Sequence, residues 1–496
     1  MTGRKPGAAG APEASSPQGA TPVEAVVVGS GPNGLAAAIS LAREGRSVTV
    51  LEGAPTVGGG VRTAELTLPG FLHDVCSAVH PFGRTSPFFA GLQLERHGLR
   101  WIEPPAAIGH PFDDGSAVLV RRDVELTANG LGGGADAAAY RRLIEPLVEG
   151  WDRLMPDILA PFHVPLDPRR AVRLASFGLD AIRSATSLAR RFRGERARGL
   201  FAGAAAHSVL GLTEPISGAA GLVMLATAHV DGWPSPEGGA GRLAGALHAE
   251  LERLGGRVVT GRWVAGLENL PPHEVALFDV VPRHLARIAG DALPSGYRRS
   301  LERYRHGAGV FKVDIAIDGA IPWRAAELAE AGSVHLGGTL EEIARSEGFV
   351  ARGGLPDRPF VLLAQTSRFD GTRAPDGRNT VWAYCHVPNG STADMTEPIL
   401  TQIERFAPGF RERILGMRAT GPAQLEAANP NDVGGDIGGG RMDLGQLFTR
   451  PTRRLGEPYA TPNPSLYLCS SATPPGGGVH GMCGFHAARA AAPRIG

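Results

Sequence analysis

Runs of apolar residues divide the chain of 496 residues into segments with different spacings. The first run, at 25–28, is followed by glycines, by apolar residues at helical spacing, and by a second short run that ends at Glu52. This order predicts a strand, a tight turn, a helix and a second, parallel strand. Similar patterns return at 238–264 and at 465–492. We therefore predict one α/β domain assembled from three pieces of the chain: 22–84, 236–292 and 425–496.

The segments between these pieces predict a second domain. Apolar residues recur every three or four positions in three stretches, which predicts helices over 136–160, 169–194 and 196–230. These helices are expected to belong to an inserted substrate or cap region at 85–235.

A sheet is expected to complete this second domain. Residues 306–318 alternate strictly and place Lys312 and Asp314 on the polar side of a strand. Further strands are expected at 360–366 and 380–387, in the same antiparallel sheet. The second domain is therefore predicted to combine 85–235 with 293–424.

The turn after the first apolar run has the glycine spacing of a dinucleotide-binding site. Gly29 permits the tight turn, Gly31 lets the backbone approach a pyrophosphate, and Gly34 lets the helix pack closely on the strand. The start of the helix then presents free N–H groups to phosphate. Glu52 follows about 20 residues later, where a carboxylate accepts the ribose hydroxyl protons of an adenosine. This unit predicts that the chain binds a dinucleotide.

Two further glycine loops extend this interpretation. Gly58 to Gly60 lie just before Arg62, and such a loop can bring backbone N–H groups and one arginine to a pyrophosphate. A surface turn with a solvated arginine is the alternative. In the tail, three glycines at 476–478 precede a helix that is expected to run from about Gly481 to Ala492.

The composition excludes several classes of function. Apolar residues make up 43% and charged residues 20% of the chain, and the formal net charge of +1 argues against a nucleic-acid partner. The four cysteines form no CxxC pair, so we expect neither a disulfide oxidoreductase nor a metal site. The cysteine usage favours a reducing, cytoplasmic setting.

No segment is predicted to cross a membrane. Residues 1–21 are rich in Gly, Ala, Pro and Ser and are expected to be a disordered lead. The most apolar stretch, 199–230, is interrupted by His207, Glu214 and His229, so we expect buried helices that line a cavity. A peripheral contact with a membrane is left open, and so is the oligomeric state.

Several motifs together resemble one family. They are GSGPNG at 29–34, GFLHDVCSAVHP at 70–81, PEGGAGRLAGAL at 236–247, GVFKVDIAIDGAIPW at 309–323, NPNDVGGDIGGG at 429–440 and LYLCSSATPPGGGVHGMCG at 466–484. From about residue 22 onward the chain is similar to the phytoene-dehydrogenase-like flavoproteins, within the wider amine-oxidase and Rab-GDI-like fold. The resemblance implies a discontinuous, Rossmann-like FAD-binding domain and a second domain of antiparallel sheet and helices that covers the isoalloxazine.

The resemblance also implies which residues hold FAD. They are Gly29, Gly31, Pro32, Asn33, Gly34, Glu52, Gly53, Gly59, Gly60, Val61, Arg62, Val264, Ser471, Gly477, Gly478, Val479 and His480. Gly60 stands where the family often has an arginine, and the tail loop has no acid for the ribityl chain, so backbone amides are expected to bind there. A helix N-terminus behind the tail glycines would stabilise the negative charge of reduced flavin.

Two residues are candidates for catalysis. The resemblance places Lys312 where amine-oxidase-like flavoenzymes hold a water near flavin N5 with a lysine. A lysine that faces solvent, or one that pairs with Asp314, is the alternative. His480 is a candidate proton carrier, and a histidine that is merely packed in the tail loop is its alternative.

Three functions fit these observations. The first is an FAD-dependent oxidoreductase (a dehydrogenase, desaturase or oxidase) in which flavin N5 accepts a hydride. Because only 6% of the residues are aromatic, we expect an aliphatic cavity and a lipophilic small-molecule substrate. The second is a redox-neutral double-bond isomerase that uses reduced FAD, and the third is a GDI-like lipid-binding protein without flavin. The intact tail loop and Lys312 favour an enzyme.

Overall fold

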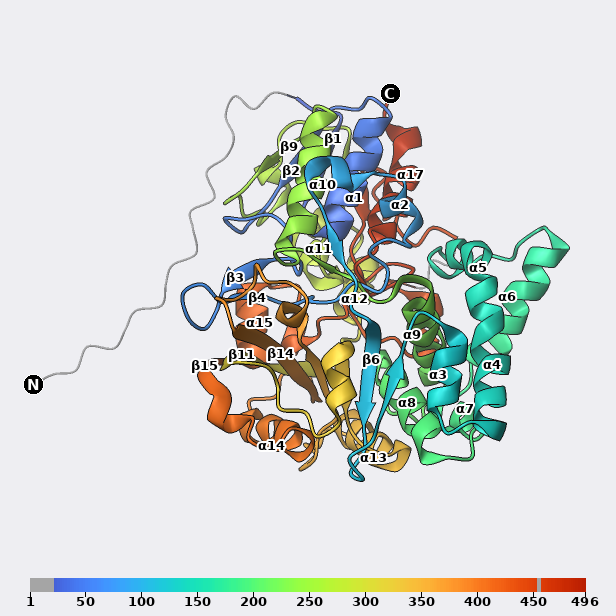
Figure 1. Cartoon of the computed structure of the whole chain (residues 1–496). Helices are drawn as coiled ribbons and strands as arrows, with labels where there is room; N and C mark the ends of the chain where they lie inside the picture. The colour runs from blue at the N-terminus through green and yellow to red at the C-terminus, as the bar shows by residue number, and fades with distance from the viewer. Residues whose placement is uncertain (1–21, 453–455) are drawn as a thin grey trace, which may run out of the picture.

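Two large β-sheets, two two-stranded sheets and a group of helices make up the described part of the protein (Figure 1). The computed structural model describes residues 22–452 and 456–496, so the predicted lead at 1–21 lies outside it. In Figure 1 the first sheet lies at the top, the second lies below it, and the helices of residues 124–231 lie mainly to the right. Within these described ranges, no helix has both the length and the hydropathy that a membrane span requires.

The first sheet contains strands from the start, the middle and the tail of the chain. Its four strand pairs are all parallel. The strand order is β16 (Leu466–Leu468), β10 (Val275–Phe278), β1 (Ala25–Val28), β2 (Val48–Leu51) and β9 (Arg257–Val259). Each of the three segments with the α/β pattern thus contributes to one sheet, while the exact domain boundaries stay a prediction.

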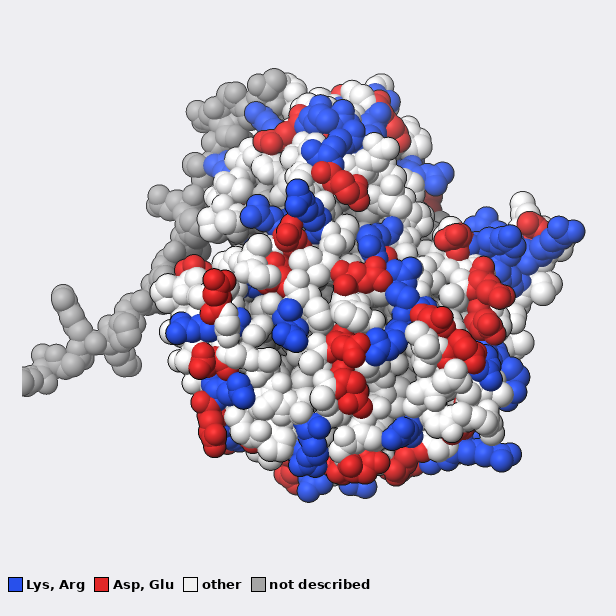
Figure 2. Space-filling view, in the orientation of Figure 1, with Lys and Arg blue, Asp and Glu red and all other residues white. Residues whose placement is uncertain are grey.

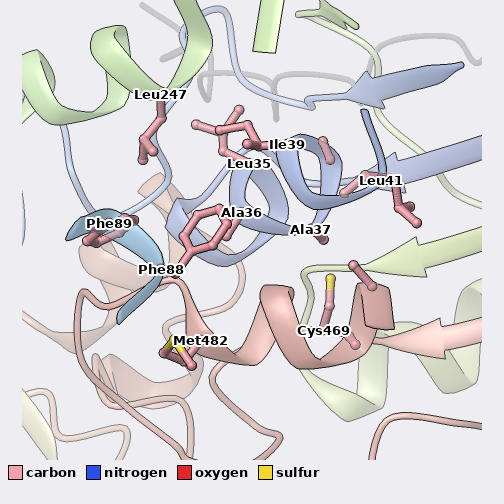
Figure 3. Close-up of a cluster of buried hydrophobic side chains, with 14 of the residues drawn as sticks. Leu35, Ala36, Ala37, Ile39, Leu41, Phe88, Phe89, Leu247, Cys469 and Met482 are labelled. Atoms are coloured by element: carbon pink, nitrogen blue, oxygen red, sulfur yellow. The ribbon is translucent and has the colours of Figure 1, made fainter. Parts of the chain in front are cut away.

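Helices cover both faces of this sheet, which explains why its strands read as continuous apolar runs. One face packs against α1 (Pro32–Arg43), α10 (Gly241–Arg253) and α17 (Met482–Ala491), and the other against α11 (Pro282–Ala289) and α12 (Ser295–Glu302). Figure 3 shows the hydrophobic core on the first of these faces, where α1 and α17 lie side by side. Their close approach needs Gly484, because a Cβ there would lie 1.8 Å from the carbonyl oxygen of Asn33.

The second sheet has seven strands and is antiparallel except for one pair. Its order is β15 (Ile414–Thr420), β11 (Gly309–Asp318), β14 (Arg378–Val387), β13 (Val361–Ala364), β12 (Ala331–Leu336), β6 (Ala106–Pro111) and β7 (Ala117–Val120). β12 and β6 pair in parallel, which corrects the expectation of a purely antiparallel sheet. One face packs against α14 (Thr396–Phe406), and the other faces α8 (Glu195–Ala205) and α13 (Leu340–Ala351).

The cap helices are shorter than the three predicted helical stretches. They are α3 (Val124–Gly130), α4 (Gly134–Glu149), α5 (Trp151–Ile158), α6 (Pro168–Ala181), α7 (Ala185–Ala189) and α9 (Ser217–Asp231), together with α8. Capping residues explain the breaks: Asp167 caps α6, and Ser184 accepts a hydrogen bond from Ser187 N to start α7. Apolar periodicity alone does not show these interruptions.

A buried ion network joins a hairpin to the second domain. The hairpin consists of β3 (Thr63–Glu65) and β4 (Leu72–Asp74). Arg373 is fully buried; its Nη1 lies 2.5 Å from Asp74 Oδ2, and its Nε lies 2.9 Å from Asp370 Oδ2. The remaining short elements are α2 (Pro87–Ala90), β5 (Trp101–Ile102), β8 (Ser235–Pro236), α15 (Pro422–Ala428) and α16 (Leu444–Thr449).

Candidate active site

One cavity of about 1190 Å³ extends from the carboxyl ends of β1, β2 and β10 to the second sheet and to α6 and α9. Ligands of open α/β sheets bind at this edge of the strands. Sixteen of the seventeen predicted cofactor residues line the cavity, and Gly34 is the exception: Gly29, Gly31, Pro32, Asn33, Glu52, Gly53, Gly59, Gly60, Val61, Arg62, Val264, Ser471, Gly477, Gly478, Val479 and His480. The volume exceeds the roughly 300–1,000 Å³ of pockets for one drug-sized ligand, so the cavity can hold a larger one.

The glycine turn brings the start of α1 to the cavity. β1 ends at Val28, and α1 begins with Gly31 as its N-cap and Pro32 as its first residue, without a side-chain cap. Gly34 has no room for a side chain, because a Cβ there would lie 2.1 Å from the carbonyl oxygen of Gly29. The dipole of α1 favours an anion at this point.

Glu52 is held in place at the end of β2. Its Oε2 accepts hydrogen bonds from Ser30 N (2.8 Å) and Ser30 Oγ (2.6 Å), and its Oε1 accepts one from Ala54 N (2.8 Å). Trp263 lies against Gly53, since a Cβ on Gly53 would come within 2.7 Å of the indole. Trp263 lines the cavity as well, which the sequence reasoning missed.

Asp279 is a second residue that the sequence reasoning missed. It follows β10, the neighbour of β1, and its Oδ2 accepts a hydrogen bond from Gly34 N at 2.8 Å. Burial raises the pKa of Asp279 to about 7, and the nearby charge of Glu52 adds to this effect. An acid directly after the apolar run VALF was the available signal, but the position of this strand beside β1 is not visible in the sequence.

The second glycine loop reaches the same end of the cavity. Gly58 N donates to the carbonyl oxygen of Ser30 (3.1 Å), which holds the loop beside the first turn. Arg62 lines the cavity, but its Nε donates to the carbonyl oxygen of Gly59 at 2.7 Å. A contact between Arg62 and a phosphate stays a prediction.

The tail loop and α17 form the next part of the wall. α17 begins at Met482, within one residue of the predicted start, with Gly481 as its N-cap. Met482 N donates to Nδ1 of His480 at 3.0 Å, which assigns the imidazole proton to Nε2. This Nε2 is buried and has no hydrogen-bond partner among the described residues, and burial lowers the pKa of His480 to about 4. At neutral pH His480 therefore lines the cavity as a neutral N–H donor.

Lys312 is buried, so the alternative of a solvent-facing lysine is wrong. Its Nζ donates to the carbonyl oxygens of Asp74 (2.9 Å) and Val75 (2.9 Å) and pairs with the Asp314 carboxylate (2.9 Å). These three acceptors use all three N–H bonds, and Lys312 is not among the residues that line the cavity. The pairing with Asp314 is therefore present, and a contact of Lys312 with a water near flavin N5 stays a prediction.

The far end of the cavity is lined by apolar and aromatic side chains. Its wall includes Leu174, Phe177, Val209, Ile216, Val223, Met224, Leu362 and the aromatic residues Trp233, Trp382 and Tyr384. The expectation of a purely aliphatic cavity is wrong, because aromatic residues from distant segments converge here. The prediction that helices of 199–230 line a cavity is confirmed for α9, whereas α8 contributes no residue to the wall.

The loop at 429–440 adds an acid that the sequence reasoning did not single out. Asp432 lines the cavity and accepts a hydrogen bond from Asn429 Nδ2 at 3.1 Å. Burial raises the pKa of Asp432 to about 8, and the charge of Asp436 contributes. Asp432 therefore presents a mainly protonated carboxyl group to the cavity at neutral pH.

Comparison with known sequences supports this architecture. The family described as NAD(P)-binding Rossmann-like domain matches residues 27–92. Pyridine nucleotide-disulfide oxidoreductase domain-containing protein 2 of Rattus norvegicus is 27% identical over 94% of this chain and 92% of its own. The phytoene dehydrogenase of Streptomyces griseus is 27% identical over 79% of this chain and 77% of its own.

Comparison with solved structures shows the same fold. A putrescine oxidase bound to putrescine has a TM-score of 0.59 at 17% identity, over 96% of this chain and 99% of that one. An oxidoreductase from Methanosarcina mazei has a TM-score of 0.62 at 15% identity, over 93% and 98%. The predicted fold class and family resemblance are confirmed. The chain is an oxidoreductase with homologues among the phytoene-dehydrogenase-like proteins and with the fold of the amine oxidases.

Proposed function

We propose that this oxidoreductase binds FAD and uses it to accept a hydride from an apolar small molecule. The observation that carries the proposal is the single cavity, which joins the glycine turn and Glu52 at one end to the apolar cap at the other. A dinucleotide bound along the first part would leave the cap end for a substrate. The fold of the relatives supports the proposal, but the identity of the cofactor rests on the cavity itself.

The residues of the cavity fit this cofactor along its length. At the first end, the N-terminus of α1 and Glu52 would hold the pyrophosphate and the adenosine. At the tail, Gly477, Gly478 and the N-terminus of α17 would approach the flavin, and His480 Nε2–H is a free donor there. When bound, FAD supplies the hydride acceptor. The chain's own residues orient both molecules and keep water out of the cap.

We also propose that the substrate reaches the cap from a membrane surface, in line with a cytoplasmic protein that contacts membranes peripherally. The outer side of α6 and the loop before it expose large apolar side chains: Phe162 (66%), Val164 (75%), Leu166 (100%), Val172 (69%), Leu179 (70%) and Ile182 (49%). On its inner side, Leu174, Phe177 and Ala181 line the cavity. α6 projects at the right of Figure 1, and Figure 2 shows arginines at the same edge. Their positive charge would favour a membrane that contains anionic lipids.

The absorbance spectrum of the purified chain tests the cofactor, and anaerobic titration with lipophilic alkenes, alcohols and amines tests the reaction. We expect a flavin spectrum that bleaches with one of these classes. A flavin that stays oxidised with every reductant in the panel would contradict hydride transfer. Activity seen only after chemical reduction would indicate the isomerase, and a colourless protein would indicate the GDI-like lipid carrier.

A further inference from the structure

The second sheet turns a polar face toward the cap end of the cavity. Strand pairing places side chains of β12, β13 and β14 in two rows across this face, which are Ser333–Ala364–Trp382 and His335–Leu362–Tyr384. Residues two apart on a strand share a face, so both rows point the same way. Four of the six residues line the cavity: Ser333, Leu362, Trp382 and Tyr384.

Two polar atoms in the first row are buried without a partner. Ser333 Oγ and Trp382 Nε1 make no hydrogen bond within the described ranges, and Ser333 is only 1% exposed. Both residues lie next to Ala364 across the sheet, Ser333 on β12 and Trp382 on β14. An indole N–H is only a donor, so the group that pairs with Trp382 has to accept a hydrogen bond. Buried polar groups in native structures are paired, which indicates a polar partner from the cavity.

The surroundings of these atoms offer hydrogen bonds but no free positive charge. His207, in the short turn η2 (Ala206–Ser208), lines the cavity, and its Nε2 lies 3.1 Å from Nε2 of His335. Burial lowers the pKa of His207 to about 3 and lowers that of His335, so both are neutral at pH 7.

The nearby ionisable groups are engaged within the protein. His386 Nδ1 lies 2.7 Å from Glu347 Oε2, behind the second row. Lys312 Nζ, which lies 5.9 Å from the Trp382 ring, is paired with Asp314. A charged ligand group would therefore lack a counter-ion at this face, whereas a neutral one would not need it.

We propose that this face is a subsite for a neutral oxygen function, a hydroxyl or a carbonyl, on an otherwise apolar substrate. The oxygen accepts hydrogen bonds from Trp382 Nε1–H and Ser333 Oγ–H, and His207 is placed to contact the same group. The apolar remainder of the molecule packs on Leu362 and Met224. The inference rests on the proposed function, because it takes the cap end as the place of the substrate.

Equilibrium dialysis of small ligands against solutions of the full chain tests this subsite. The probes are octan-2-one, octan-2-ol, octane and the cationic 2-aminooctane. We expect Ser333→Ala and Trp382→Phe each to weaken the ketone and the alcohol about three- to ten-fold, the effect of losing one neutral hydrogen bond. Octane should change less than two-fold. Trp101→Phe is the matched control, because Trp101 on β5 is not among the residues that line the cavity, and it should change none of the probes.

A rescue variant and three contrary results complete the test of the subsite. Restored ketone binding in Ser333→Thr would support it, with thermal unfolding confirming that every variant is folded. Unchanged ketone binding in both variants, equal weakening of octane, or equal weakening of the amine would overturn it. Absorbance of the same samples reports separately on the cofactor. A yellow protein without the ketone effect rejects only the subsite, and a colourless protein with the effect rejects only the proposed function.

Discussion

At the scale of single residues, the fold changes the ionisation of Asp279, which accepts a hydrogen bond from Gly34 N in the glycine turn. Its pKa in the folded chain is about 7, whereas the usual value is 3.8, because the group is buried beside Glu52. Between about pH 4 and pH 7 the folded state therefore keeps a proton that the unfolded chain releases. The stability that this protonation contributes is lost as the pH rises through 7.

Replacing Asp279 with Asn should remove this pH dependence, since the amide oxygen still accepts the hydrogen bond from Gly34 N. Between pH 5 and pH 8.5 we expect the free energy of unfolding of Asp279→Asn to gain about 2.7 kcal/mol relative to the wild type. Urea unfolding at the two pH values measures the difference. Asp376→Asn, at an exposed site, is the control and should follow the wild type. Parallel pH profiles of Asp279→Asn and the wild type would show that Asp279 has an ordinary pKa.

At the scale of elements, α6 separates the cavity from the outer surface with apolar side chains on both sides. If its outer side enters a membrane, the double change Leu166→Ser and Leu179→Ser should reduce binding to anionic phosphatidylserine vesicles more than ten-fold, since each buried leucine contributes roughly 1.5–3 kcal/mol. Vesicle co-sedimentation measures this. Leu415→Ser, on exposed β15, is the control and should bind like the wild type. Equal binding of all three proteins would exclude α6 as the contact.

Some of these elements could be located from the sequence alone, and others could not. Strict alternation placed β11 to within three residues, and the glycine spacing located the start of α1, because both signals are local. The parallel pairing of β12 with β6 was missed, since it joins segments more than 200 residues apart that carry no common pattern. The polar row of Ser333 and Trp382 was missed for the same reason. Lys312 was found on the correct face, but its acceptors come from the hairpin at Asp74, whose position the sequence does not reveal.

At the scale of the whole molecule, the first sheet and the cavity depend on three distant segments that meet only in the folded state. A ligand that touches all three should stabilise the fold by more than a ligand that touches one. ADP would contact the glycine turn and Glu52, whereas FAD would also contact the tail at His480. A ligand that binds only the native state adds RT ln(1 + [L]/Kd), or roughly 2.7 kcal/mol at a hundredfold excess over Kd.

We therefore expect removal of FAD to lower the unfolding temperature by several degrees, re-addition to restore it, and ADP to restore only part of it. Two substitutions test the two ends of the cavity separately. Glu52→Gln should reduce the stabilisation by both ligands, because both place a ribose there. His480→Phe should reduce only that by FAD, because it removes the Nε2–H donor from the tail wall. Differential scanning fluorimetry of the stripped protein measures all four combinations. Equal stabilisation by ADP and FAD, unaffected by His480→Phe, would mean that the tail does not contact the cofactor and that the cavity is used only at its first end.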